Sequence, residues 1–430
     1  MTKILKIERT CKQLSGVGGL FLYNRLWKQL CMEKGLVNCL PLNKIKPKVT
    51  SLDKTKALVM GLITGADCLD DMDDLFLDLG FDNVVSSSAS NTYGEFLRSF
   101  SNLNTKNLNH SLVDTAFKLR KRSHHDAREF ILDIDSTSHS QCGSKIEGAS
   151  WNYKNEWCLD SLLAFDQFGY LYWLDVRNGS TYSANSCSEV IHAVFSKIFD
   201  KRIKRYARAD SAFCNGEFFQ ACFNAKTSFV VRMKENMLIP ILGKVTNWKK
   251  AKSVRMNDNR ECEIGNTLYY PNSTPSVLKV VVIRALKNEK QGALFTDDKY
   301  EYFAVVTNIS EQVMKNESVM AFYRKRGNAE NYIKELKYGF DLKHFPCQSL
   351  TANKAYGVIA AIAYNMMRYT AFLTKLKKVS FSKKLRLQLV KLPCEVIKHA
   401  GYVTFRYSSH IYEEVTRLLH IMNMQFQSGL

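Results

Sequence analysis

The sequence contains no cysteine pair spaced as Cys-x-x-Cys, although 12 of its 430 residues are cysteine, and it has only 7 prolines. Structural zinc sites and the disulfide frameworks of small secreted domains usually need closely spaced cysteines, so we expect neither. The opening residues do not resemble a secretory signal. We therefore expect reduced, mostly buried thiols in a cytoplasmic protein.

No hydrophobic run is long enough to cross a bilayer. The best candidate, the charge-free stretch from Ala355 to Met367, has 13 residues, whereas a spanning helix needs about 18 or more. We expect it to be a buried helix, and we expect no membrane partner. Hydrophobic residues make up 46% of the chain, which is ordinary for a globular protein and argues against disorder as the main state.

Acidic residues are scarce relative to basic ones. Lys and Arg total 61 against 41 Asp and Glu, a net charge of +20. The excess lies at the two ends, because residues 1–60 and 351–430 each carry 12 basic and 3 acidic side chains. Two basic ends around a nearly neutral middle favour nucleic acid as the partner, since basic side chains neutralise its phosphates. A merely solubilising surface is the alternative interpretation.

The hydrophobic pattern changes along the chain. Helical spacing dominates residues 13–40 and 51–130, and from there short alternating segments predict strands at 130–135, 158–166, 169–176, 206–209 and 228–233. Helices are expected at 187–200 and 215–224, between the later strands. This order predicts a mixed sheet with helices packed against it. Further helices are expected at 316–340, 353–376 and 411–424, and a strand at 402–407.

Several polar residues of the helix expected at 316–340 lie on one edge of its apolar face. At about 100° per residue, an arc of about 60° contains Tyr323, Arg326, Glu330 and Lys337. A carboxylate beside two cations and a phenol suits a site that holds both a metal ion and a phosphate. An ordinary surface ladder of ion pairs is the alternative.

Two aspartates are expected at strand ends, Asp135 after the first strand and Asp210 after the fourth. In open sheets, ligands bind beyond the carboxyl ends of strands. With Glu330 they would form a set of oxygen ligands for two Mg²⁺ ions, which serve phosphoryl transfer by activating one oxygen and stabilising another. Asp133 is a rival for Asp135, because residues i and i+2 of a strand share a face.

These motifs resemble the DDE transposases of bacterial insertion sequences, and most closely the subgroup with the Tyr-x2-Arg-x3-Glu-x6-Lys signature. The signature is matched without a gap by Tyr323, Arg326, Glu330 and Lys337. Leu-Asp-Ile-Asp135-Ser-Thr resembles the first catalytic aspartate motif, and Arg-Ala-Asp210-Ser-Ala-Phe resembles the second. The resemblance spans roughly residues 130–345.

The resemblance implies an α/β fold, namely a ribonuclease-H-like mixed sheet with flanking helices, interrupted by a β-rich insertion and preceded by a helical N-terminal domain. The implied segments are a helical DNA-binding region (1–125), the first part of the catalytic core (126–237), the β-rich insertion (238–300), the remainder of the core with the Glu helix (301–376) and a basic C-terminal region (377–430).

The resemblance also implies roles for single residues. The expected catalytic residues, which would also hold two Mg²⁺ ions with Mn²⁺ as a substitute, are Asp135, Asp210 and Glu330. The residues expected to bind DNA phosphates are Tyr323, Arg326 and Lys337. Trp248 is a candidate for base stacking, because related transposases hold a flipped base with an aromatic residue of the insertion; simple burial is its alternative.

The function implied is a cut-and-paste DNA transposase that binds the terminal inverted repeats of an insertion sequence and catalyses metal-dependent strand cleavage and strand transfer. Its partners would be double-stranded DNA, both terminal repeats and target, and a second copy of the chain on DNA, in the nucleoid of a bacterial cytoplasm. Two alternatives are a metal-dependent DNA nuclease on the same core and a transposase-derived DNA-binding protein. The three intact carboxylates argue against the last.

Overall fold

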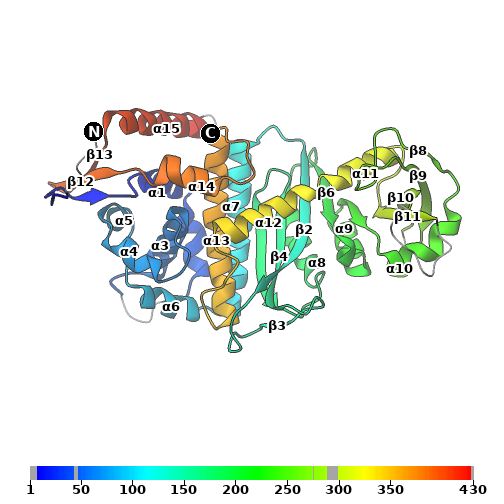
Figure 1. Ribbon diagram of the computed structural model, residues 1–430, viewed down its shortest axis with the longest axis horizontal. Helices are drawn as coiled ribbons and strands as arrows, with labels where there is room; N and C mark the ends of the chain where they lie inside the picture. Colours follow the sequence, from blue (N-terminus) through cyan, green and yellow to red (C-terminus); the bar gives the residue numbers. More distant parts are fainter. Residues whose placement is uncertain (1–6, 43–46, 275, 288–298, 428–430) are drawn as a thin grey trace, which may run out of the picture. The chain divides into compact units, whose positions relative to one another are not determined.

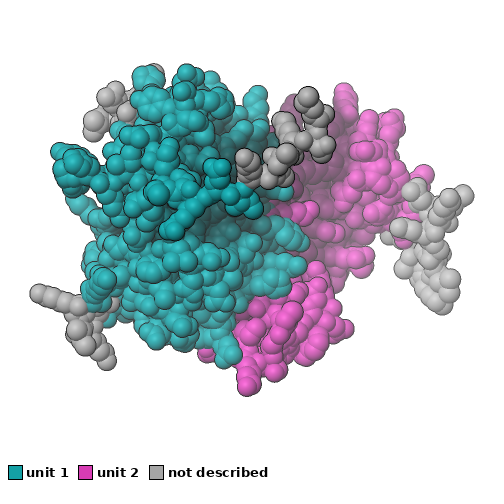
Figure 2. All heavy atoms as spheres, turned by 60° about the vertical axis from the view of Figure 1, so that its left-hand side comes forward, with its two compact units in different colours: residues 1–123, 335–430 teal, residues 124–334 magenta. Residues whose placement is uncertain are grey.

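A computed structural model describes residues 7–42, 47–274, 276–287 and 299–427 (Figure 1). The described chain divides into two compact units, residues 1–123 with 335–430, and residues 124–334 (Figure 2). The first unit is mostly helical, and the second contains a large sheet. The five segments expected from the sequence stay a prediction.

The first unit contains a bundle of helices and a small antiparallel sheet. Its helices are α1 (Leu20–Gln29), α2 (Met32–Leu36), η1 (Val37–Cys39), α3 (Ser51–Thr64), α4 (Asp71–Leu77), α5 (Leu79–Val84), α6 (Ser90–Arg98), α7 (Asn102–Ser123), α13 (Leu350–Leu373), α14 (Ser382–Leu385), η4 (Arg386–Val390) and α15 (Ser409–Gln427). Its sheet has the order β1 (Leu14–Ser15), β12 (Cys394–His399), β13 (Tyr402–Arg406). Strand β12 was not expected from the sequence.

Helix α13 forms the centre of this unit. It runs beside α7 and also contacts α3 (Figure 1). Every residue from Ala355 to Met367 is buried, so the expected buried helix is confirmed, and its lack of charge follows from that burial. Among the described residues, no helix is long and apolar enough to cross a membrane.

The second unit is built on a ten-stranded sheet. Its strands are β2 (Glu129–Ser140), β3 (Ser150–Trp151), β4 (Trp157–Asp166), β5 (Leu171–Asn178), β6 (Lys204–Ala209), β7 (Ser228–Arg232), β8 (Lys249–Lys250), β9 (Glu263–Tyr269), β10 (Leu278–Leu286) and β11 (Tyr300–Thr307). Its helices are α8 (Cys187–Phe195), η2 (Ser211–Phe213), α9 (Gly216–Asn224), α10 (Glu235–Leu238), η3 (Ile239–Lys244), α11 (Asn316–Arg324) and α12 (Gly327–Gly339), whose last turn belongs to the first unit.

The central strands of this sheet follow the order β5-β4-β2-β6-β7. Strand β4 is antiparallel to both β5 and β2, whereas β2, β6 and β7 are parallel to one another. The mixed sheet with flanking helices is consistent with a ribonuclease-H-like fold. Parallel pairing brings the carboxyl ends of β2 and β6 to the same edge, and these ends carry the two aspartate motifs.

Strands β8 to β11 continue the same sheet. Strand β11 pairs antiparallel with β7 through three residue pairs, and β10, β9 and β8 follow in antiparallel order. The region expected to be a β-rich insertion therefore contributes to the central sheet. Its limits at residues 238–300 stay a prediction.

Two local expectations were wrong. Strand β2 does not end at Asp135 but continues to Ser140, because antiparallel pairing with β4 extends as far as Ser140 opposite Cys158. The helix expected at 316–340 is two helices, α11 and α12. Between them the chain turns, with hydrogen bonds that span only three residues, from Arg326 N to Tyr323 O and from Ala329 N to Arg326 O.

Candidate active site

The register of β2 against β6 places Asp135 beside Asp210. Asp133 pairs with Arg208, and Ile134 pairs with Ala209. One residue further along each strand stand Asp135 and Asp210, at the point where the parallel pairing ends. The two carboxylates are close enough for their charges to interact. The meeting of these two residues, expected from sequence, is thus a consequence of strand register.

Asp210 holds its own loop in place. Its backbone is extended, and its side-chain Oδ1 accepts a hydrogen bond of 2.9 Å from Ala212 N, which caps the short helix η2. An aspartate before a helical turn is a favourable cap because its oxygen satisfies a free backbone N–H. The second carboxylate oxygen of Asp210 stays available for a ligand, and the side chain is half-buried.

Asp135 is buried and faces a guanidinium group. Arg326 Nη1 lies 2.8 Å from Asp135 Oδ2, and both side chains are only 12–13% exposed. Burial raises the pKa of Asp135 to about 6, against the lowering effect of Arg326 and with a further rise from Asp210. Burial alone would lower the pKa of Arg326, but the charge of Asp135 keeps it above its ordinary value. Two negatively charged carboxylates that repel each other near a buried position suit a divalent cation. The cation would offset both their mutual repulsion and the desolvation cost of the buried charge.

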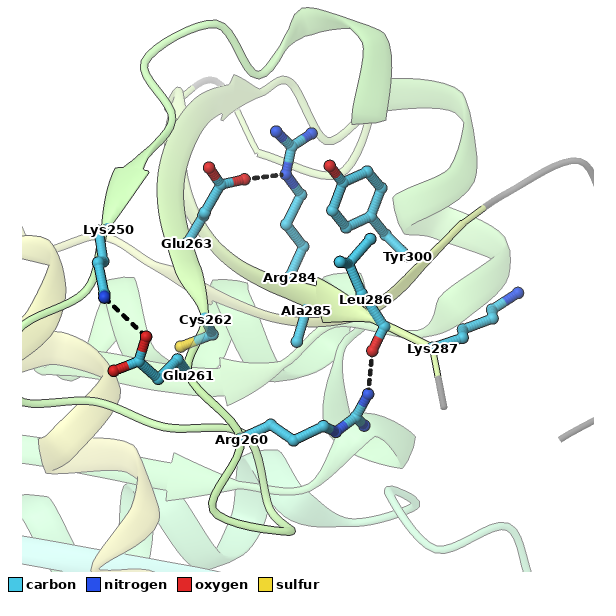
Figure 3. Close-up of a pocket in the computed structure, with 10 residues that line it drawn as sticks. All are labelled: Lys250, Arg260, Glu261, Cys262, Glu263, Arg284, Ala285, Leu286, Lys287 and Tyr300. Carbon is cyan, nitrogen blue, oxygen red and sulfur yellow. Dashed lines mark hydrogen bonds and ion pairs between the residues drawn. The ribbon is translucent and has the colours of Figure 1, made fainter. Parts of the chain in front are cut away.

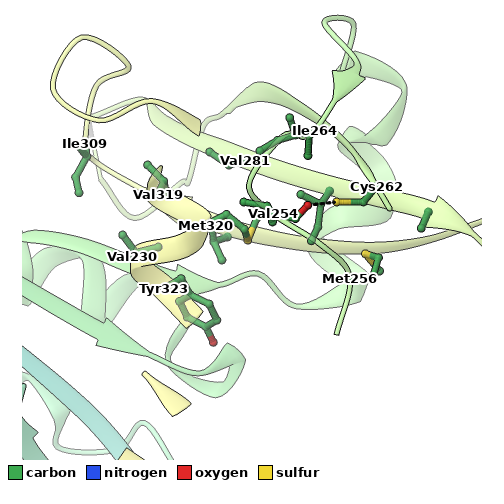
Figure 4. Packing of buried hydrophobic residues seen from close by; sticks show 14 of the residues in the cluster. Val230, Val254, Met256, Cys262, Ile264, Val281, Ile309, Val319, Met320 and Tyr323 are labelled. Carbon is green, nitrogen blue, oxygen red and sulfur yellow. Dashed lines mark hydrogen bonds between the residues drawn. The ribbon is translucent and has the colours of Figure 1, made fainter. Parts of the chain in front are cut away.

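Tyr323 is a core residue as well as a neighbour of this site. It is 6% exposed and belongs to a buried cluster with Val230, Val319 and Met320 (Figure 4). Burial raises the pKa of its hydroxyl, and a hydrogen bond with Arg326 acts in the opposite direction. The buried phenol therefore helps to fix the position of the Arg326 guanidinium through this hydrogen bond.

Glu330 and Lys337 lie further along α12. Glu330 is exposed in the first turn of this helix, and Lys337 is half-buried in its last turns. Among the described residues, no three or more His, Cys, Asp or Glu side chains form a group that could hold a metal ion. The structure brings together Asp135, Asp210, Arg326 and Tyr323, but it does not bring Glu330 into that group. Its role as a ligand stays a prediction.

Asp133, the rival of Asp135, has a different environment. Arg208 Nε and Nη2 each donate a 2.7 Å hydrogen bond to one of its two carboxylate oxygens, and both side chains are at most 2% exposed. Burial raises the pKa of Asp133, while Arg208 opposes that rise. Arg208 Nη1 also donates to Phe322 O at 2.6 Å and lies over the Phe322 ring. The pair therefore ties β2, β6 and the end of α11 together.

Trp248 is half-buried just before β8. The Arg284 guanidinium lies 4.0 Å from the Trp248 ring centroid and 4.4 Å from that of Tyr300. Arg284 Nε also donates to Glu263 Oε2 at 2.8 Å, at the edge of a pocket of about 520 Å³ (Figure 3). One face of Trp248 is thus covered by a cation, so a base can stack there only if Arg284 moves.

Comparison with protein families gives a result that is consistent with this geometry. The family model described as Transposase DDE domain group 1 matches residues 2–426. The chain belongs to this family. No curated protein matches it. Membership in the DDE transposase family supports a transposase, an enzyme that cleaves or transfers nucleic acid strands and has DNA as its partner. DDE transposases generally use divalent metals.

Sequence reasoning overlooked Arg208 in this DDE-domain chain. It appeared only as the first residue of the second aspartate motif, although it stands between Ala207 and Ala209 on a buried strand. A charged residue flanked by small apolar residues in a buried strand usually has a buried partner of opposite charge. That signal was present in the sequence, but the partner could be named only from the register of β6 against β2.

Proposed function

We propose that this chain is a cut-and-paste DNA transposase of a bacterial insertion sequence, from the subgroup with the Tyr-Arg-Glu-Lys signature. It binds the terminal inverted repeats of its element, cuts the strands and joins the ends to target DNA. The observation that carries the proposal is the meeting of Asp135, Asp210 and Arg326 at one sheet edge. Two strand motifs and one helix motif, far apart in sequence, converge there.

Asp135, Asp210 and Glu330 would hold two Mg²⁺ ions, and Mn²⁺ would substitute for them. When bound, the ions supply activation of the attacking oxygen and stabilisation of the leaving oxygen in phosphodiester cleavage. The crowded charges of Asp135 and Asp210 support this assignment. Glu330 stands on the exposed side of α12, where a carboxylate can reach a ligand without cost from burial.

Arg326 would hold a DNA phosphate as well as steady Asp135. A guanidinium group grips a phosphate through two parallel hydrogen bonds and keeps its charge at every physiological pH. Tyr323 orients it from the core, and Lys337 would add a point charge further along the same helix. Water acts first as the nucleophile, and the freed 3′-OH acts next on target DNA. Trp248 would stack on a base once Arg284 leaves its ring.

The two basic ends of the chain support binding of double-stranded DNA, because +18 of the net +20 charge lies in residues 1–60 and 351–430. Recognition of the terminal repeats would lie mainly in residues 1–125, and two copies of the chain would hold the two ends of the element. The protein would act at the nucleoid of the bacterial cytoplasm.

A joining assay tests this function against the nuclease alternative. Pre-cut terminal repeats with free 3′-OH ends are mixed with a target plasmid and Mg²⁺, and joined product is expected. A nuclease would degrade DNA without ever joining it, and a DNA-binding protein would do neither. Glu330→Gln should abolish joining, whereas Asn331→Ala, the next exposed residue of α12, should join normally. Joining by the Glu330 variant at the normal rate would remove this residue from the site.

A further inference from the structure

A second feature of the sheet edge is a polar pocket beside Asp210. The pocket has a volume of about 840 Å³, and its lining includes Asp210 and Ser136, the residue after Asp135. Such a volume is that of a small-molecule site, typically about 300–1,000 Å³. It can accept a nucleotide or two of a single strand, but not a segment of duplex. Many of its other lining side chains carry hydroxyl groups, which donate hydrogen bonds to phosphate oxygens.

Two tyrosines on the lining are exposed to solvent. Tyr153 is 86% exposed at the tip of the β3–β4 hairpin, and Tyr182 is 45% exposed in the loop between β5 and α8. Each has a lysine ammonium beside its ring, Lys154 Nζ at 5.5 Å from one ring centroid and Lys234 Nζ at 5.3 Å from the other. Aromatic rings interleaved with cations are typical of grooves that bind single-stranded nucleic acid, because bases stack on the rings while cations follow the phosphates.

The Tyr182 side of the pocket is tied to the candidate active site. Lys234 Nζ donates to Tyr182 Oη at 2.8 Å, and Tyr182 Oη donates to Ala212 O. Ala212 N in turn donates to Asp210 Oδ1. A chain of three hydrogen bonds thus joins the lysine to the carboxylate that is expected to hold metal. A phosphate bound by Lys234 would therefore occupy the pocket that Asp210 also lines.

The loop that carries Tyr182 is fixed by hydrogen bonds from a buried ion pair. Arg177 pairs with Asp160, and its Nη1 donates to Asn185 O at 2.8 Å and to Ser183 O at 3.3 Å. Both Arg177 and Asp160 are buried. Tyr182 is therefore presented on a fixed backbone, and a preformed aromatic surface loses little entropy when a base stacks on it.

We propose that this pocket binds an unpaired stretch of the DNA strand next to the cut phosphate, with bases stacked on Tyr182 and Tyr153 and phosphates on Lys234 and Lys154. The inference rests on the proposed function, since it places a strand beside the carboxylates that would cut it. It adds a separate requirement, which is that the DNA is locally opened on this side of the site.

The test is binding of a fluorescent ten-nucleotide oligothymidylate to the full chain in EDTA, measured by anisotropy. Tyr153→Ala or Tyr182→Ala alone should weaken binding about 5- to 150-fold, the range for loss of one stacked base, and the double variant should weaken it further. Tyr182→Phe keeps the ring and should bind nearly normally. Tyr270→Ala, at a tyrosine that is 66% exposed just after β9, is the matched control and should bind as the unmodified chain does. A 5-iodouracil base in the oligonucleotide should also crosslink to Tyr182 or Tyr153.

Two outcomes would overturn the inference. One is unchanged oligonucleotide binding by the double variant. The other is an equal loss for a duplex of the same length, because the pocket would then contact paired DNA. Since the measurement uses no metal and no cleavage, its failure is separate from failure of the joining assay. If the unmodified protein joins ends and the double tyrosine variant still binds oligothymidylate normally, the proposed function stands and the proposed role of the pocket is wrong.

Discussion

Asp133 and Asp135 stand two residues apart on β2, yet they lie in opposite surroundings. The region around Asp133 is closed, because Arg208 satisfies both carboxylate oxygens and each side chain is at most 2% exposed. The region around Asp135 is less completely neutralised. Among the described residues, one guanidinium group contacts Oδ2, only the backbone N–H of Ser136 donates to Oδ1, at 2.9 Å, and the charge of Asp210 repels that of Asp135. A buried carboxylate that is fully paired has a structural role, whereas a carboxylate that is only partly neutralised can still bind a metal ion or substrate.

The largest effect should come from the region around Asp135. Asp135→Asn or Asp210→Asn should reduce single-turnover cleavage of terminal-repeat DNA on the order of 10⁴-fold, as expected for members of a catalytic set that act as a unit. Both variants should still bind the end DNA, because neither removes a basic side chain. Gel-shift and cleavage assays on the same protein preparations measure the two quantities.

Asp133→Asn is the internal control for that comparison. It should lose less cleavage activity than Asp135→Asn, because Asp133 is already committed to Arg208. The reverse order would mean that Asp133 is the catalytic carboxylate and that its pair with Arg208 opens when DNA binds.

The closed region should show its importance in stability. Asp133→Ala leaves the Arg208 charge buried without a partner, so the free energy of unfolding should fall by about 3–5 kcal/mol. Replacement of both partners, Asp133→Leu with Arg208→Met, should restore most of that loss, because packed apolar side chains often replace a buried ion pair at little cost. Denaturant unfolding measures both. A loss below about 1 kcal/mol in the single variant would contradict the closed character of this pair.

A smaller loss of cleavage is expected for the cations of the signature segment, Arg326 and Lys337. Arg326→Lys keeps the charge but loses the planar fork, so cleavage should fall about 10²-fold, the cost of a small misplacement at a reacting centre. Lys337→Ala should lose less, because an ammonium group acts only as a point charge. Metal affinity and thermal stability should stay close to normal in both. Loss of the fold in Arg326→Lys would make this residue structural.

Much of the catalytic sheet could be predicted from the sequence. Its central strands and the helices α8 and α9 follow alternating and helical spacing closely, because each packs one regular face on the core. The meeting of Asp135 and Asp210 also followed, since both come at the carboxyl end of the paired part of a parallel strand. The buried middle of helix α13 could be predicted because residues 355–367 carry no charge and are too few to cross a bilayer.

Other features depend on contacts between distant residues. A helical wheel treats residues 316–340 as one rigid rod, whereas the hydrogen bonds at Arg326 turn the chain and place Tyr323 in the core. The partner of Arg208 depends on strand register, and the continuation of β2 through a polar segment depends on its ladder with β4. The Tyr182–Lys234 contact joins residues 52 positions apart in two loops, and no local pattern marks such a pair.

The smallest effect concerns Asp341, a carboxylate outside both regions. Burial raises its pKa to about 7, with a further rise from the charges of Asp67 and Asp71 and an opposing effect from Lys343. The folded protein therefore holds this proton more tightly than the unfolded chain does. Stability should consequently be lost as pH rises from about 4 to about 7. Asp341 belongs to no motif, so it tests whether a raised pKa alone marks a catalytic carboxylate.

Asp341→Asn removes the charge but keeps the shape, and asparagine tolerates the positive φ of 49° at this position. At pH 8 the variant should be more stable than the unmodified chain by on the order of 1 kcal/mol, after allowance for partial exposure, whereas near pH 4 the two should be equal. Cleavage should not change. Denaturant unfolding at both pH values gives the difference. If the gain does not grow with pH, Asp341 is ionised in the folded chain at no cost; if cleavage falls as it does for Asp135→Asn, then burial and a raised pKa mark catalytic carboxylates here as well as structural ones.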